Sequence, residues 1–183
     1  MRFVIAALLA LTLAGCDKGE QQQPQGNQQV QTGRIDRSLA GMPAPATPFL
    51  GPQDEPVTLA SFRGKPLIVN LWATWCAPCL AEMPALDTFA KSTGDKAQVI
   101  AVSVDLEGRR AVTPYFAKMK FGALKPYLDK DNVLPLGVRA AGLPTTLVYD
   151  ANGKEVLRVN GPLKWDGPEG RKLLEELASG TKA

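Results

Sequence analysis

Two cysteines placed between a strand pattern and a helix pattern constrain the fold of this chain more than any other feature. Residues 67–71 form a short, mostly apolar run that is typical of a buried strand. Over residues 80–90 the apolar side chains recur at spacings of three and four, which predicts a helix packed on the core. A second strand-like run covers residues 99–104. We therefore expect Cys76 and Cys79 at the strand-to-helix junction of a β-α-β unit.

The rest of the chain continues this alternation of helices and strands. Thr113 as N-cap and Pro114 at the first helical position predict a second helix, with Gly122 as its stop. Turn-forming residues at 150–153 predict an antiparallel hairpin. Its strands cover residues 145–149 and 155–160, and a closing helix turns Leu173, Leu174 and Leu177 inward. This order predicts an α/β fold, a central mixed sheet with helices on both faces.

Composition excludes several classes of function. The 21 basic and 18 acidic residues nearly balance, so no basic field for binding nucleic acid is present. With three cysteines and no histidine, one chain cannot assemble a closed zinc site of four Cys or His ligands. The lack of histidine also excludes Ser-His and Cys-His nucleophiles. Any proton transfer must therefore use a carboxylate, a thiol or water. We expect neither a metal nor a cofactor.

The position of the two cysteines predicts disulfide exchange. Cys76 lies near a helix N-terminus, where free N–H groups and the helix dipole favour a thiolate. Cys79 follows about one turn later, so it can attack a mixed disulfide formed on Cys76 and release the partner reduced. Between them, Pro78 removes an N–H donor and stiffens the turn, while the small Ala77 lets another chain approach.

Other interpretations of the pair are weaker. A zinc half-site lacks ligands, and a structural disulfide rarely links cysteines so close at such a junction. A peroxidase of related fold would carry Thr three residues before the reactive cysteine, where this chain has Ala73. A thiol-based module that binds Cu(I) or a client without disulfide turnover remains an alternative, because soft thiolates select Cu(I).

The segment from Asn70 to Cys79, Asn-Leu-Trp-Ala-Thr-Trp-Cys-Ala-Pro-Cys, closely resembles the active site of thioredoxin-like proteins. In particular it resembles the TlpA and ResA group of membrane-tethered extracytoplasmic reductases. The similarity continues at residues 57–66 and 142–146. It implies a thioredoxin-like fold with a helix-containing insertion before the cis-proline strand. It also implies that Pro144 is the cis-proline facing the cysteines, with Leu143 offering its backbone to a bound partner.

Two positions distinguish the chain from cytosolic thioredoxin. Asn70 replaces the buried aspartate of that protein, so the usual buried base is missing. Glu82 matches a glutamate of the TlpA and ResA group and is a candidate acceptor for the proton of Cys79. An ordinary solvated helix residue is the alternative for Glu82. Trp72 is expected in the core, whereas Trp75 is expected to line the docking surface beside Cys76.

The N-terminus predicts export and lipid anchoring. Arg2 and an apolar run of eleven residues, too short to span a bilayer, form a signal peptide over residues 1–15. Leu-Ala-Gly-Cys at its end resembles a lipobox, which implies a lipid on Cys16, and Asp17 resembles an inner-membrane retention signal. An ordinary signal or an uncleaved anchor with an incidental cysteine is the alternative. Residues 16–46, rich in Gln, predict a disordered tether, which leaves residues 47–183 as the thioredoxin-like domain.

These features together predict a thiol:disulfide oxidoreductase that is lipid-anchored to the cytoplasmic (inner) membrane and faces the periplasm or extracytoplasmic space. Its expected substrates are disulfides of exported proteins, as in cytochrome c or copper-site maturation. Because export places the chain in an oxidising compartment, a reductase there needs a membrane thiol-transferring electron donor. For residues 106–141, which are longer than a minimal thioredoxin requires, partner recognition and added core both remain open.

Overall fold

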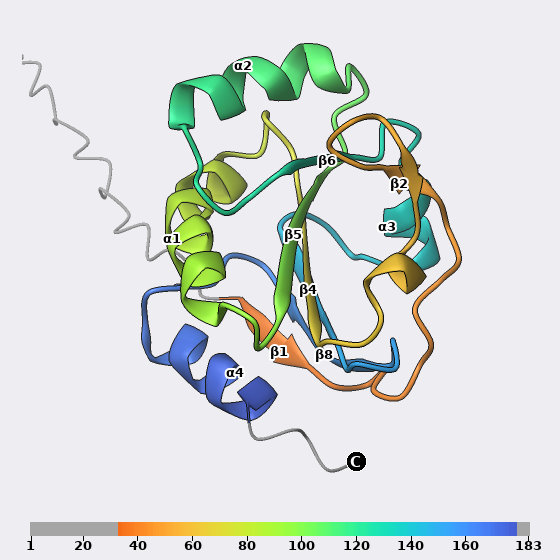
Figure 1. The fold of residues 1–183 in the computed structure, drawn as a ribbon, viewed down its shortest axis with the longest axis vertical. Helices are drawn as coiled ribbons and strands as arrows, with labels where there is room; N and C mark the ends of the chain where they lie inside the picture. Colours follow the sequence, from red (N-terminus) through yellow and green to blue (C-terminus); the bar gives the residue numbers. More distant parts are fainter. Residues whose placement is uncertain (1–32, 179–183) are drawn as a thin grey trace, which may run out of the picture.

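The computed structural model describes residues 33–178, which form one mixed sheet with helices on both faces (Figure 1). The signal peptide, Cys16 and residues 17–32 of the expected tether lie outside the described residues. The strands are β1 Arg34–Asp36, β2 Phe49–Leu50, β3 Pro56–Val57, β4 Leu67–Trp72, β5 Gln98–Ser103, β6 Pro126–Leu128, β7 Thr145–Tyr149 and β8 Glu155–Asn160. The helices are η1 Leu59–Phe62 (a 3-10 helix), α1 Ala77–Thr93, α2 Arg109–Met119, α3 Val133–Gly137 and α4 Pro168–Ala178.

The strand order in the sheet is β1-β8-β7-β4-β5-β6-β2-β3. Strands β4, β5 and β6 run parallel, and β7 pairs antiparallel with β4 on the other side. The carboxyl ends of the three parallel strands and the start of β7 therefore meet at one edge of the sheet. The loop that leads to Cys76 leaves the sheet at this edge, directly after β4, and Cys79 follows in the first turn of α1.

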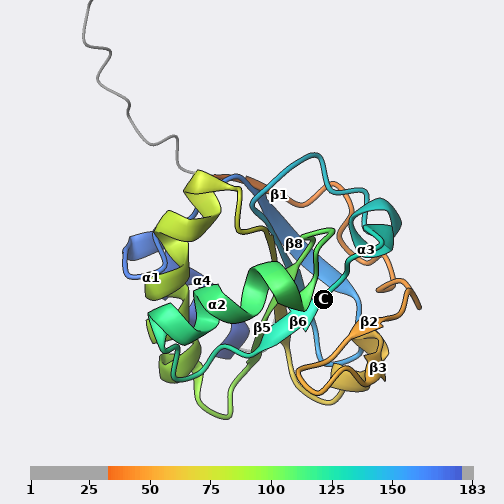
Figure 2. The same ribbon diagram turned by 90° about the horizontal axis from the view of Figure 1, so that it is seen from above.

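Alternating side chains of the central strand build two separate cores. Ile68 and Trp72 point into a cluster completed by α1, α2 and α4, whereas Val69 and Leu71 point into a cluster on the other face. The second cluster is closed by Leu59 of η1 and Leu134 of α3, with Phe49 and Tyr149. Figure 2 shows α1 and α4 on one side of the sheet and α3 on the other. Because both faces are covered, the inner strands are mostly apolar, and their few polar residues, such as Asn70 and Thr146, are buried as well.

The predicted β-α-β unit and hairpin are confirmed. Helix α1 covers the expected region and ends at Thr93, directly before Gly94, whose φ of 52° suits a residue without a side chain. Strands β7 and β8 have the predicted bounds, and Asp150 Oδ1 holds their turn by accepting from the N–H groups of Asn152 and Lys154. The closing helix is present as α4, with Leu173 and Leu177 buried.

The start of the second helix was predicted wrongly. Helix α2 begins at Arg109 after Gly108, so Thr113 is not its N-cap and Pro114 lies inside it. Side-chain contacts of the first residue explain the extra turn. The Arg109 guanidinium donates to Asp54 Oδ1 at 2.7 Å and to the Gly51 carbonyl at 2.6 Å. These bonds stabilise a first turn that local sequence does not signal, and the helix ends at Met119 rather than at Gly122.

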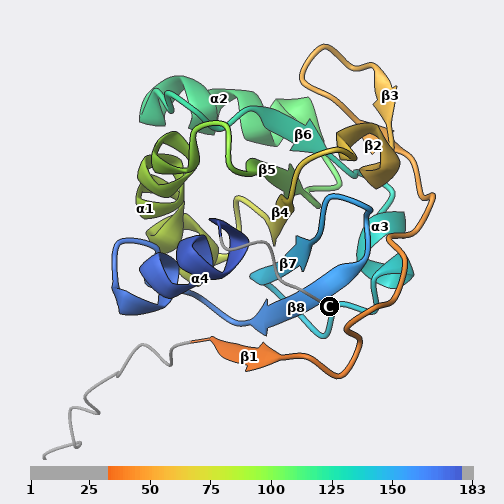
Figure 3. The same ribbon diagram turned by 60° about the horizontal axis from the view of Figure 1, so that its bottom comes forward.

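The tether boundary expected at residue 46 also lies too late. Arg34–Asp36 forms β1, which pairs antiparallel with β8 at the outer edge of the sheet (Figure 3). Pro43 then bridges Lys154, and the Gly41 N–H donates to the Glu155 carbonyl at 2.7 Å. The outer edge of β8 has backbone N–H and C=O groups that β1 pairs with, so Arg34–Asp36 joins the sheet although Arg34 and Asp36 are charged.

Candidate active site

The reactive loop runs from the end of β4 to the start of α1. Cys76 is the N-cap of α1, with Ala77 and Pro78 opening the helix and Cys79 completing its first turn. Proline suits this position because the first N–H groups of a helix have no partner within it. The first turn carries no acidic residue. The positive end of the helix dipole therefore acts on Cys76 without a competing charge.

The two cysteines form a disulfide bond and differ in access to solvent. Their Cα atoms lie 5.2 Å apart. Cys76 is buried but keeps an exposed fraction of 6%, whereas Cys79 has none, so Cys76 is the one of the two sulfur-bearing residues that borders solvent. The Cys79 N–H donates to Cys76 Sγ at 3.3 Å, which places a hydrogen-bond donor where a thiolate would form.

The residues expected around the pair lie at the same edge. Trp75 is 70% exposed, and Ala77 and Pro78 are exposed beside it. The Leu143–Pro144 peptide bond is cis, as the resemblance implied. Because Leu71 of β4 pairs with Thr145, this bond lies at the end of β4 that leads to the cysteines.

The backbone of Leu143 is available at this edge. Leu143 itself is half-buried, and within residues 33–178 its N–H and C=O groups make no backbone hydrogen bond. A free amide and carbonyl beside the cysteines can pair with the backbone of an approaching chain.

Glu82 is buried in the structure. It is 6% exposed, so the alternative of a solvated helix residue is wrong. Asn70 Nδ2 donates to Glu82 Oε1 at 2.8 Å, and the Leu163 N–H donates to Oε2 at 2.8 Å. Burial raises the pKa of Glu82, and these two hydrogen bonds oppose that rise. A buried carboxylate with a raised pKa, one helical turn from Cys79, is suited to accept a proton.

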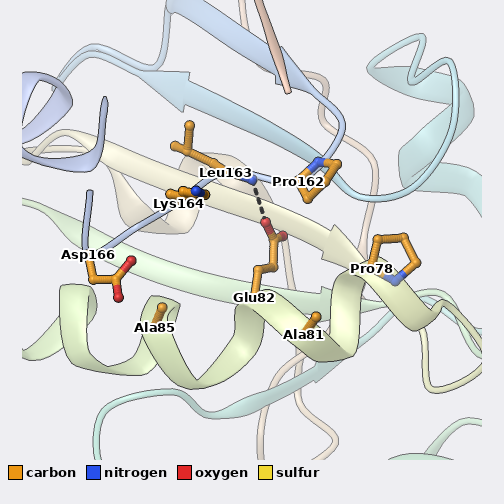
Figure 4. Close-up of a pocket in the computed structure, with 8 residues that line it drawn as sticks. All are labelled: Pro78, Ala81, Glu82, Ala85, Pro162, Leu163, Lys164 and Asp166. Atoms are coloured by element: carbon orange, nitrogen blue, oxygen red, sulfur yellow. Dashed lines mark hydrogen bonds between the residues drawn. The ribbon is translucent and has the colours of Figure 1, made fainter. Parts of the chain in front are cut away.

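A cavity of about 300 Å³ opens over Glu82 (Figure 4). The α1 side of its wall is small or apolar, with Pro78, Ala81 and Ala85. The opposite wall comes from the loop between β8 and α4 and consists of Pro162, Leu163, Lys164 and Asp166. Figure 4 shows Glu82 rising from α1 toward Leu163 between these walls. The cavity is open to solvent and has the buried Glu82 carboxylate in its lining.

Sequence reasoning missed a buried acid that anchors the reactive loop. Asp105, 4% exposed, accepts hydrogen bonds from Thr74 N–H at 2.9 Å, Thr74 Oγ1 at 2.6 Å and Ser103 Oγ at 2.7 Å. It thereby joins the end of β5 to the loop two residues before Cys76. Its place two residues after β5, a strand parallel to β4, was the signal available in the sequence, since such strand ends share one edge.

The described part of the chain offers neither a metal centre nor a membrane-spanning helix. No group of three or more His, Cys, Asp and Glu side chains gathers within residues 33–178. Over the same residues, every helix is too short or too polar to cross a bilayer.

Comparison with known proteins agrees with this site. The family model described as Redoxin matches residues 39–174. The thiol:disulfide interchange protein HelX of Rhodobacter capsulatus is 33% identical over 84% of this chain and 85% of its own length. The thiol-disulfide oxidoreductase ResA of Oceanobacillus iheyensis is 33% identical over 62% of this chain and 59% of its own length.

A solved structure supports the fold. The thioredoxin domain of a thiol-disulfide oxidoreductase from Bacteroides vulgatus superposes with a TM-score of 0.64 at 24% identity, covering 76% of this chain and 97% of that one. The family match spans both cysteines, the cis-proline and Glu82. The chain therefore belongs to the Redoxin family, as a thioredoxin-like thiol:disulfide oxidoreductase of the TlpA, ResA and DsbE type.

Proposed function

We propose that the chain reduces disulfides of exported proteins through a Cys76/Cys79 dithiol-disulfide cycle. The observation that carries this proposal is the asymmetry of the pair. Cys76 lies at a helix N-terminus free of acidic residues and keeps a small exposed fraction of 6%, whereas Cys79 has no exposed surface. The first thiol is placed to attack and the second to resolve.

The cycle balances in two exchange steps. The Cys76 thiolate attacks one sulfur of the substrate disulfide, and the other substrate sulfur leaves as a thiolate that takes a proton from water. Cys79 then gives up its proton and attacks Cys76 Sγ. The Cys76–substrate bond breaks, the Cys76–Cys79 disulfide forms, and the substrate leaves fully reduced. Two electrons pass from the dithiol to the substrate, and the chain ends in the disulfide form that the structure shows.

Glu82 accepts the proton of Cys79 in the second step. Its burial and its place one turn along α1 support this role, since Asn70 replaces the usual buried acid and cannot titrate. A water in the cavity above Glu82 can carry the proton from sulfur to carboxylate. The cavity then returns the proton to solvent.

The substrate docks on the exposed edge around Cys76. Trp75, Ala77 and Pro78 supply side-chain contacts, while Leu143 before cis Pro144 supplies free backbone groups. An extended substrate segment pairing with that backbone would bring its sulfur to Cys76, as in other cases of strand addition.

Location and electron supply complete the proposal. A signal peptide over residues 1–15 exports the chain, and a lipid on Cys16 anchors it to the cytoplasmic membrane. Two or more acyl chains hold a protein stably at a bilayer, whereas one binds reversibly. A thiol-transferring membrane protein then returns the Cys76–Cys79 disulfide to the dithiol. Substrates of cytochrome c or copper-site maturation fit this place, and the names of the relatives support the exchange activity.

Replacing the resolving cysteine tests the proposal. In Cys79→Ala the second step cannot occur, so exported substrates should stay bound to Cys76 as mixed disulfides. Affinity purification without reductant, followed by mass spectrometry of adducts released by reductant, would identify them. The control Cys76→Ala should trap nothing, because Cys79 is buried. An absence of adducts on Cys79→Ala in the extracytoplasmic fraction would contradict exchange and favour a Cu(I)- or client-binding module.

A further inference from the structure

Asn70 is a polar residue in a strand where an apolar one would pack better. Every other residue of β4 is apolar or aromatic, and Asn70 is fully buried. Its Oδ1 atom is buried and accepts no hydrogen bond from any of residues 33–178. An unpaired buried oxygen destabilises a fold. Packing therefore does not explain Asn70, and the amide calls for another role.

The other side of the same amide is fully engaged. Asn70 Nδ2 donates to Glu82 Oε1 at 2.8 Å and to Thr146 Oγ1 at 3.1 Å. Thr146 lies directly across the β4–β7 ladder from Asn70, so the ladder fixes the distance between amide and hydroxyl. With one hydrogen held by each acceptor, the amide plane is set by the sheet rather than by Glu82.

The orientation of the amide suits an ionised Glu82. Rotating the amide by half a turn would place Oδ1 against the carboxylate oxygen and repel it. With Nδ2 forward, Asn70 donates to Oε1 while the Leu163 N–H donates to Oε2. Both oxygens are thus held by donors, in a site where burial opposes ionisation.

We propose that Asn70, held by Thr146, is a positioning residue that orients the Glu82 carboxylate and keeps it in the ionised form that accepts a proton. This inference rests on the proposed role of Glu82. Asn70 stands where thioredoxin has a buried aspartate, and the inference gives Asn70 a function in the proton transfer from Cys79 to Glu82.

Other charged or titratable groups near Glu82 could also change its titration, and their contribution must be separated from that of Asn70. The titratable or charged side chains around it are Cys79 on α1, and Lys164 and Asp166 across the cavity. The oxidised protein removes Cys79 from the titration, because a disulfide sulfur carries no proton. Recording the titration at low and high salt separates the two cavity charges, since salt screens exposed charges far more than buried contacts.

The test is a carboxyl NMR titration of Glu82 in the oxidised full-length chain, with the resonance assigned by its loss in Glu82→Gln. Asn70→Val removes the amide and should raise the pKa of Glu82 by about one pH unit, the effect expected for losing one hydrogen bond to a charge. Asn70→Thr also lacks the amide and is closer to Asn in volume. It should raise the pKa of Glu82 as well, and it replaces Asn70→Val in the test if that variant does not fold. As a control, Thr93→Val changes a buried polar residue at the far end of α1 and should leave the titration of Glu82 unchanged.

A shift below about 0.3 pH units in both folded variants would overturn the inference. A second readout separates it from the proposed function. The second readout is the pH dependence of the rate at which the reduced protein is oxidised in a single turnover. Asn70→Val should move the acidic limb of this pH–rate profile to higher pH. The double variant Asn70→Val/Glu82→Gln should show the same profile as Glu82→Gln alone. If Glu82→Gln leaves that limb in place, the proton-acceptor role fails. If Glu82→Gln abolishes the limb while Asn70→Val leaves it unmoved, only the positioning role fails.

Discussion

Glu82 makes a residue-scale prediction about stability and pH. Its pKa in the folded protein lies above its ordinary value of 4.5 because of burial. Between those two values the folded state binds more protons than the unfolded state, so stability falls as the pH rises through that window. The unfolding free energy of Glu82→Gln should therefore fall less with rising pH than that of the wild-type protein. Urea unfolding of the oxidised proteins at about pH 4 and pH 8 measures this, and equal declines would contradict it.

At the scale of single residues, the sequence predicted which residues belong to the site better than it predicted how buried they are. The cysteines, Pro144 and Trp75 could be placed because a motif fixes them next to recognisable elements. The burial of Glu82 could not be predicted, since it depends on Leu163, which lies 81 residues along the chain. For Asp105 only its place after β5 was a signal, because its partner Thr74 comes from another loop. Contacts between distant segments leave little trace in local patterns.

Asp105 makes the prediction at the scale of elements, because it joins the ends of β4 and β5. Asp105→Asn would turn an NH₂ group toward donors that now face a carboxylate, leaving at least one buried donor unpaired. We expect a loss of about 1–3 kcal/mol in unfolding free energy. Disulfide reduction should also change in rate, since the loop before Cys76 loses its anchor. Asp131→Asn, in an exposed pair with Lys130, should stay within about 0.5 kcal/mol. Equal stability of the two variants would refute the anchor.

Elements with strong local signals were predicted, and short ones were not. Strand β4 and helix α1 have clear periodicity, and β7 and β8 are set by their turn. Strands β2 and β3 have two residues each, and β6 has three, so pairing with neighbours defines them. For residues 106–141 the structure adds β6 to the sheet and places Leu134 of α3 in the second core. That region therefore contributes core, which decides one half of the question the sequence left open.

At the scale of the whole molecule, the direction of electron flow must appear in the stability of the two redox forms. A thermodynamic cycle links the potential of the pair to the difference in unfolding free energy between disulfide and dithiol. A strong oxidant is one whose reduced form is stabilised. Here the helix N-terminus can stabilise only the thiolate of Cys76, its N-cap, while reduction leaves a second thiol at Cys79, which has no exposed surface and lies in the apolar cluster of α1.

We therefore predict that the oxidised protein is more stable than the reduced one. Urea unfolding of both forms, with the reduced form kept under dithiothreitol, would measure the difference. Each 1.4 kcal/mol in favour of the oxidised form lowers the potential by about 30 mV relative to the unfolded pair. Equilibration with glutathione gives the potential independently, so the two measurements must agree. A more stable reduced form, together with a potential near the roughly −120 mV of strong oxidants, would reverse the proposed direction and make the chain a donor of disulfides.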